Sequence, residues 1–354
     1  MIIQKSGLTI SRREVLKAGA GLAAVATLGA PNIVRAQSKT ITVANSGGAI
    51  ETAFKAAYFD TFEQKTGIKV ISAPYLDSAK LKAMVDAKSV DIDVSDLDAA
   101  EAAPAAEMGL LEEIDYNVVP SKGLQTGSAN PYWTNIYIAA SVIAWNIDAA
   151  KGMQIPKNWK EFFNPDIKGQ RTLWKSANQT LELAALGSGV DPKKLYPIDL
   201  DAAFKTLDGI RSEISWFESG AQAAQLVSDN QVDFGMVWNG RIQPLKAKGA
   251  PVDYTFDNAL FTYGDLCVPK GVKDKALSME FIAHCVDAKN QAIFAENIPY
   301  GPTNQEAFAQ LSAARLAEIP NSPENFSKGT MIDVDYWVKN GKEVFDRFNN
   351  WVVG

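Results

Sequence analysis

The chain has 354 residues, of which 47% are hydrophobic and 21% are charged, a composition typical of a folded globular protein. Its formal net charge of −6 makes nucleic acid and anionic membrane surfaces poor partners. One histidine and two cysteines leave little material for a metal site, so we expect no metal and no cofactor.

Residues 1–36 have the layout of an export signal. A basic stretch comes first, an uncharged run from Ala18 to Leu28 follows, and the small residue Ala36 marks the expected cleavage point. The apolar run is about half the ~20 residues that a membrane-spanning helix needs. The segment SRREVLK resembles a twin-arginine signal, although Val15 replaces the aromatic residue usual there. We predict a cleaved twin-arginine signal and a periplasmic protein; a general secretory signal that happens to hold two arginines is the alternative.

Cleavage changes both the charge and the size of the chain. It removes five of the 35 Lys and Arg residues and one of the 41 Asp and Glu residues, which leaves a net charge of −10. The remaining chain is longer than one hydrophobic core usually supports, so two domains are expected.

The first part of the mature chain alternates strands and helices. Short segments rich in β-branched residues predict strands over 40–44, 68–71 and 90–94. Helical spacing predicts one helix that begins near Ala49 and ends at Gly67, and another over 78–88. This alternation is typical of a parallel sheet with helices on its faces.

The rest of the chain predicts a second unit of the same kind. The apolar run 136–145 indicates a buried strand. Further strands are predicted over 171–174, 233–238 and 266–269, and helices over 159–163, 176–186, 200–210, 221–229 and 275–285. Extended runs over 137–145 and 257–266 join the two units.

We therefore predict an α/β protein with two lobes, a hinge of two crossovers and a ligand cleft between the lobes. Lobe 1 comprises 37–143 and 266–308, and lobe 2 comprises 144–265 and 309–354. Ligands of open α/β sheets bind beyond the carboxyl ends of the strands. That rule indicates segments 46–48, 96–98, 175–177 and 238–241.

Four segments carry a family resemblance. The segment 62–70 (FEQKTGIKV) is similar to the first helix and second strand of solute-binding proteins of ABC importers. Segments 235–240 (GMVWNG), 266–271 (LCVPKG) and 299–304 (PYGPTN) resemble the spermidine/putrescine-binding branch, and their order matches over the mature chain. The resemblance implies a type II periplasmic binding protein, a monomer that closes around a small ligand and delivers it to an inner-membrane permease.

The resemblance also implies an aromatic pocket with acids near the amine ends of the ligand. Trp238 stands where the branch has a pocket tryptophan, and Tyr300 matches a pocket tyrosine. Tyr137 lies on a run that contributes to the cleft. For each of these aromatics, simple core packing is the alternative.

The chain departs from this branch in its charges. Ser46–Gly48 replaces an aromatic residue, and the segment 174–180, which carries a pair of acids in the branch, has no carboxylate. Asp265 remains but is displaced by one position, and Arg241 adds a cation. We hypothesise that Arg241 grips the carboxylate of a short ω-amino acid such as 4-aminobutyrate and that Asp265 holds its ammonium. In the alternative, Arg241 faces water and the ligand is a polyamine.

Two further segments complete the set of candidates. Gly47 and Gly48 fit either a loop whose N–H groups approach an anion or a plain turn. Asp98 can reach the cleft, whereas Asp91 and Asp93 fit solvated or capping roles. The predicted ligand-binding residues are Ser46, Gly48, Asp98, Tyr137, Trp238, Arg241, Asp265 and Tyr300.

Other classes of protein have weaker support. The chain has no Gly-x-Gly-x-x-Gly and no Gly-x-Ser-x-Gly motif, and His284 lies in an apolar helical run as a packed side chain, so a secreted enzyme is a distant alternative. A ferric-iron binder needs clustered tyrosines, for which only Tyr132 and Tyr137 are candidates. Cys267 and Cys285 are either a disulfide or two buried thiols. A binding protein that serves a chemoreceptor has the same sequence features.

Overall fold

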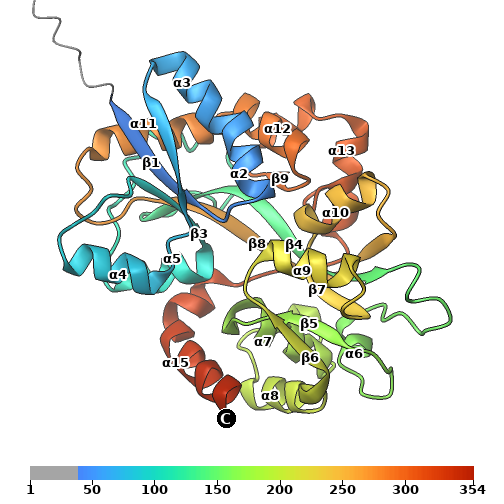
Figure 1. The fold of residues 1–354 in the computed structure, drawn as a ribbon. Helices are drawn as coiled ribbons and strands as arrows, with labels where there is room; N and C mark the ends of the chain where they lie inside the picture. The colour runs from blue at the N-terminus through green and yellow to red at the C-terminus, as the bar shows by residue number, and fades with distance from the viewer. Residues whose placement is uncertain (1–38) are drawn as a thin grey trace, which may run out of the picture. The chain divides into compact units, whose positions relative to one another are not determined.

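The computed structural model describes residues 39–354 (Figure 1). The predicted export signal over 1–36 and its cleavage point after Ala36 lie outside the described residues. Within 39–354, no helix is both long enough and apolar enough to cross a membrane.

The strands of this part of the chain belong to one mixed sheet. Its main path has the order β2-β1-β3-β8-β4-β7-β5-β6, with β9 paired to β4 and β10 to β8. The strands are β1 (Thr40–Asn45), β2 (Lys69–Pro74), β3 (Val94–Asp98), β4 (Trp133–Asn146), β5 (Arg171–Trp174), β6 (Ile214–Phe217), β7 (Phe234–Trp238), β8 (Val252–Cys267), β9 (Gly301–Pro302) and β10 (Thr330–Met331).

The two long strands β4 and β8 form an antiparallel pair in the middle of the sheet. Parallel strands flank the pair on each side: β1 with β2 and β3, and β5 with β6 and β7. Almost every residue of β4 is buried, which agrees with its mostly apolar sequence. Because each long strand continues from one parallel group to the other, both predicted crossovers are extended and lie side by side.

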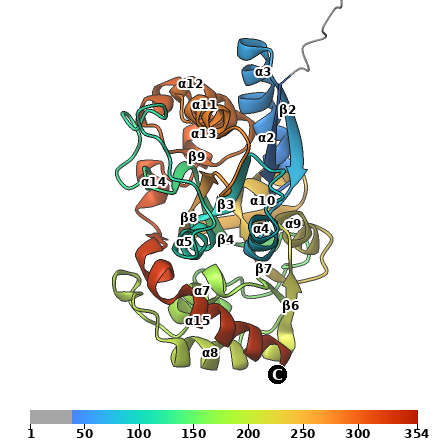
Figure 2. The same cartoon turned by 90° about the vertical axis from the view of Figure 1, so that its left-hand side faces the viewer.

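Helices cover the sheet (Figures 1 and 2). The α-helices are α2 (Ala49–Phe54), α3 (Asp60–Thr66), α4 (Ser78–Asp86), α5 (Ala99–Glu107), α6 (Trp159–Phe162), α7 (Ala177–Gly187), α8 (Leu200–Asp208), α9 (Gly220–Ser228), α10 (Asn239–Ala247), α11 (Lys275–Cys285), α12 (Ala288–Asn297), α13 (Ala313–Glu318), α14 (Pro323–Phe326) and α15 (Val334–Val353). A π-helical segment, Lys55–Phe59, joins α2 to α3, and Gly67 ends this continuous helix in the left-handed conformation that the sequence predicted.

Two predicted elements need correction, and one helix was not predicted. The third strand occupies Val94–Asp98 rather than 90–94, because its ladder with β1 begins only where Val43 pairs with Val94. The segment before it has no regular secondary structure, and the side chain of Asp93 accepts a hydrogen bond from the backbone N–H of Thr42 (2.8 Å). The predicted strand over 266–269 is the end of the long strand β8, and a helix, α10, begins directly after β7.

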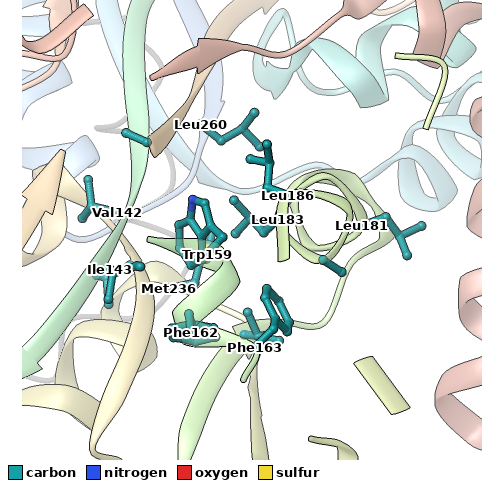
Figure 3. Close-up of a cluster of buried hydrophobic side chains, with 14 of the residues drawn as sticks. Val142, Ile143, Trp159, Phe162, Phe163, Leu181, Leu183, Leu186, Met236 and Leu260 are labelled. Carbon is teal, nitrogen blue, oxygen red and sulfur yellow. The ribbon is translucent and has the colours of Figure 1, made fainter. Parts of the chain in front are cut away.

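The two largest hydrophobic clusters lie toward opposite ends of the sheet. One gathers α6, α7 and the flanking strands around Trp159, Phe162 and Leu183 (Figure 3). The other packs α2 and α3 against α11 and α12 and includes Phe62 and Phe281. The C-terminal helix α15 packs against α5 and α7. The borders of the two lobes stay a prediction.

The cysteines and the histidine are packed side chains. Cys267 and Cys285 are both free and buried, and they belong to different hydrophobic clusters, so the disulfide hypothesis is wrong. His284 is buried as predicted, and its Nε2 lies 2.7 Å from the hydroxyl of Thr61.

Candidate functional site

A cavity of about 190 Å³ lies at the centre of the sheet, where the carboxyl ends of β1, β3 and β7 meet the long strands. It is smaller than the roughly 300–1,000 Å³ typical of pockets for drug-sized ligands, so it suits a small solute. Six of the eight predicted residues line it: Ser46, Asp98, Tyr137, Trp238, Arg241 and Tyr300.

Arg241 is a buried cation without a carboxylate partner. It lies in the first turn of α10, and only 9% of its surface is exposed. Its Nη1 donates to the carbonyl of Gly47 (3.1 Å) and its Nη2 to that of Ser46 (3.5 Å), whereas its Nε has no partner. No salt bridge to Arg241 forms among residues 39–354. A buried charge left unpaired is costly, so this guanidinium favours an anionic ligand group.

Two glycines make room for this guanidinium. A Cβ on Gly48 would lie 3.0 Å from Nη1 of Arg241, and a Cβ on Gly220 would lie 2.9 Å from its Nε. Gly48 also has a φ of +58°, a conformation that side chains disfavour. Gly48 is therefore a neighbour of Arg241 rather than part of the cavity wall.

The proposed anion nest at this loop needs correction. The N–H of Gly47 already donates to the side chain of Asn45 (2.9 Å), and the carbonyls of Ser46 and Gly47 face Arg241. The loop therefore offers hydrogen-bond acceptors to a cation.

Asp96 is the buried acid of the cavity. Its carboxylate accepts hydrogen bonds from the hydroxyls of Ser46 and Tyr137, each at 3.1 Å. Burial raises the pKa of Asp96 to about 7, while these hydrogen bonds and the nearby Arg241 oppose the rise. Asp96 forms no salt bridge within the described part of the chain.

Asp98 is already saturated with donors. It caps α5 by accepting from the backbone N–H of Ala100 (2.9 Å), and it accepts from the hydroxyl of Thr262 (3.0 Å). The side-chain amides of Asn178 (2.7 Å) and Gln179 (3.3 Å) donate to it as well. Burial raises the pKa of this carboxyl, and all four donors oppose the rise.

Asp265 does not line the cavity, and the predicted ammonium contact therefore has no support at this residue. In the ladder between β3 and β8 it pairs with Leu97, while Asp96 pairs with Leu266. Paired residues share a face of the sheet and successive residues alternate, so Asp265 lies on the face opposite Asp96. The one-residue displacement noted in the sequence places its side chain on that face.

The predicted aromatics serve as both packing groups and cavity walls. The ring of Trp238 meets Trp174 edge to face, with ring centroids 5.2 Å apart. Tyr137 and Tyr300 stack with centroids 5.2 Å apart. Because all four also line the cavity, core packing and ligand contact are compatible at these positions.

Asp96, Gln179 and Glu218 line the cavity but are not among the predicted ligand-binding residues. Asp96 belongs to a segment that the strand-end rule indicated, but the misplaced third strand hid the direction of its side chain. Gln179 has a φ of +66°, which a sequence pattern does not predict for a residue other than glycine. Glu218 is exposed and forms an ion pair with Lys175 (3.2 Å).

Metal ligation has no support in the part of the chain that the structure describes. No group of three or more His, Cys, Asp or Glu side chains is placed to hold a metal ion there. The hydroxyl of Tyr137, one of the two tyrosines considered for ferric iron, donates a hydrogen bond to Asp96.

This geometry, a small polar cavity between two parallel strand groups that share two long crossovers, is that of a type II periplasmic binding protein. The chain belongs to the family of bacterial extracellular solute-binding proteins, whose profile matches residues 57–326. A twin-arginine translocation signal matches residues 9–29, which confirms the predicted export route. The protein is thus an exported, periplasmic solute-binding component of an ABC importer, which binds a small ligand and delivers it to a permease.

Three comparisons place the chain more finely. It is 33% identical over 331 residues to the gamma-aminobutyric acid-binding protein of Pseudomonas aeruginosa, covering 90% of this chain and 92% of that protein. It is 24% identical to spermidine/putrescine-binding periplasmic protein 1 of Haemophilus influenzae, covering 78% and 79%. The solved structure of the Atu4243-GABA receptor matches with a TM-score of 0.80 and 35% identity, covering 88% of this chain and 97% of that one. These relatives are solute-binding proteins and not enzymes.

Proposed function

We propose that the cavity binds a short zwitterionic amino acid of the 4-aminobutyrate kind. Arg241 holds the carboxylate of the ligand through its guanidinium, and Asp96 accepts hydrogen bonds from the ammonium. The aromatic rings of Trp238 and Tyr300 pack against the alkyl chain between the two charges.

The observation that carries this proposal is the balance of charges in the cavity. Three carboxylates line it, but Asp98 is saturated with donors and Glu218 pairs with Lys175. The groups left are one cation, Arg241, and one carboxylate, Asp96, which do not pair with each other in the described chain. A zwitterion satisfies both, whereas a diamine leaves the buried guanidinium without an anion.

The relatives support the same ligand class. The names of the P. aeruginosa relative and of the Atu4243 receptor both specify gamma-aminobutyric acid (GABA) as the ligand. Each protein is at least 33% identical to this chain. Because these relatives are solute-binding proteins, they also support a role in ligand binding rather than in catalysis.

We further propose that the protein acts as a monomer whose lobes close over the ligand, with the borders given by the sequence. The hydrogen bonds from Arg241 to the carbonyls of Ser46 and Gly47 join predicted lobe 2 to predicted lobe 1. They lie beside the proposed carboxylate site, so binding of the ligand there favours closure.

Polyamine binding is the second candidate. It is favoured by the aromatic walls, which suit an alkyl chain with ammonium ends, and by the H. influenzae relative. Recognition of the closed form by a chemoreceptor, in addition to the permease, is compatible with this proposal.

Titration calorimetry of the mature protein with 4-aminobutyrate and with putrescine tests the proposal. We expect 4-aminobutyrate to bind and putrescine to bind far more weakly. If only putrescine binds, the proposal of a zwitterionic ligand is wrong. Arg241→Ala should weaken 4-aminobutyrate binding by roughly 2–5 kcal/mol, because a buried charge partner is lost, and should hardly change putrescine binding. Arg347→Ala is the matched control, since Arg347 lies outside the cavity, over Phe204.

A further inference from the structure

The start of α7 has an unusual backbone on the wall of the cavity. Asn178 has an extended ψ of 136°, and Gln179 has a φ of +66°, so neither is helical although both lie within the helix bounds. Both side chains are almost completely buried. Backbone strain of this kind persists where the surrounding contacts hold it, and it concentrates at ligand sites.

The orientation of the Gln179 amide is fixed by its neighbours. Its Oε1 accepts from the indole N–H of Trp238 (2.9 Å) and from the hydroxyl of Ser141 (2.6 Å). Because an indole N–H can only donate, the oxygen of the amide must face Trp238. The amide nitrogen therefore faces Asp98, to which it donates at 3.3 Å.

The amide of Asn178 engages the other oxygen of Asp98 at 2.7 Å. Together with the backbone of Ala100 and the hydroxyl of Thr262, the two amides supply four donors to one carboxylate. A carboxylate has about four lone-pair sites, so Asp98 has none left for a ligand.

We propose that Asn178 and Gln179 determine the charge specificity of the cavity, because their neutral amides occupy Asp98 and deny it to a second ammonium group. This inference rests on the proposed function and explains why a cavity with three carboxylates accepts one ammonium. A diamine has to displace protein donors to reach Asp98, whereas an amino acid with a single ammonium uses Asp96 and leaves the amides in place.

The test is the substitution Gln179→Glu. The new side chain keeps an oxygen for Trp238 and Ser141, but it removes a donor from Asp98 and places a second carboxylate beside it. We expect putrescine affinity, measured by titration calorimetry, to rise about tenfold or more, which is the size of one charge-assisted hydrogen bond. Affinity for 4-aminobutyrate should change less, so the ratio of the two affinities shifts toward the diamine.

Gln225→Glu is the matched control. Gln225 also donates its amide to an aspartate, Asp229 (3.2 Å), but it is exposed on α9 and lies outside the cavity lining. The control adds the same charge and removes the same kind of hydrogen bond, and it should leave both affinities unchanged. If Gln179→Glu does not fold, as judged by thermal unfolding, Asn178→Asp places a carboxylate beside the other oxygen of Asp98.

The outcomes separate this inference from the proposed function. If the native protein binds 4-aminobutyrate and no variant gains putrescine binding, masking of Asp98 is wrong and the proposed function stands. If the native protein binds neither ligand but Gln179→Glu binds putrescine, the proposed ligand is wrong and the masking stands. If the native protein binds putrescine as tightly as 4-aminobutyrate, or if no form binds either ligand, both are overturned.

Discussion

Asp96 and Asp265 lie on neighbouring strands, β3 and β8, in almost the same place along the sheet. Asp96 pairs with Leu266 and Asp265 pairs with Leu97, so acid and leucine alternate across the ladder and the two acids face opposite sides. Asp96 lines the cavity and accepts two hydrogen bonds from hydroxyl groups. Neither oxygen of Asp265 has a hydrogen-bond partner within residues 39–354.

The environments of these two acids have opposite consequences. Burial raises the pKa of both, to about 7 for Asp96 and well above its ordinary range for Asp265. For Asp96, the ammonium group of the proposed ligand would stabilise the ionised form. Asp265 lies between Leu97 on β3 and Asn135 on β4, where its burial without a hydrogen-bond partner opposes folding.

The largest effect that we predict comes from removing the charge on the cavity side. Asp96→Asn should weaken 4-aminobutyrate binding by roughly 2–5 kcal/mol, because the ammonium loses a buried charged partner. Titration calorimetry at pH 8 measures this change. The same substitution on the other face, Asp265→Asn, is the matched control and should leave the affinity unchanged. Equal losses in both variants would show that the two faces do not differ in the way proposed.

The second effect concerns stability. Asp265→Leu should raise the free energy of unfolding by about 1–3 kcal/mol at neutral pH, because it removes a buried polar group without partners. The raised pKa of Asp265 makes its contribution favourable below its unfolded pKa of about 4, and this contribution is lost as the pH rises toward the folded pKa. The gain in the variant should therefore grow with pH in denaturant titrations. A gain that is constant or falls with pH would contradict the assignment.

The smallest effect is the pH dependence of binding. Because the pKa of Asp96 is about 7 without ligand and the ammonium requires the ionised form, 4-aminobutyrate affinity should fall as the pH drops below 7. Between pH 8 and pH 6 the loss should be about tenfold, or ~1.4 kcal/mol. Calorimetry across this range measures it, and Asp96→Asn should show a flat profile. An affinity that rises toward pH 6 would exclude Asp96 as the ammonium partner.

Local patterns in the sequence predicted much of the fold. Apolar runs located β1, β4, β5 and β7, and Gly67 marked the end of the first long helix. The third strand was misplaced because Val90 to Val94 has the same alternation as a strand, and only the pairing with β1 decides which residues join the ladder.

The candidate site was predicted in part for the same reason. Trp238, Tyr300 and Arg241 were found because they follow strands or match a family segment. Asp265 was predicted because it is the acid that remains near the second crossover. Its one-residue displacement was visible in the sequence, but only the pairing with β3 shows that the side chain therefore lies on the face opposite the cavity.

The sequence by itself determined that this protein is exported, that it is an α/β solute-binding protein, and that one cation stands among the aromatics of its cleft. These properties depend on local composition and on motifs in a fixed order. Only the tertiary structure decided which carboxylates line the cavity and how many protein donors reach each of them. That depends on the donors that reach each acid from distant segments, as Asn178 and Gln179 reach Asp98 across 80 and 81 residues of sequence.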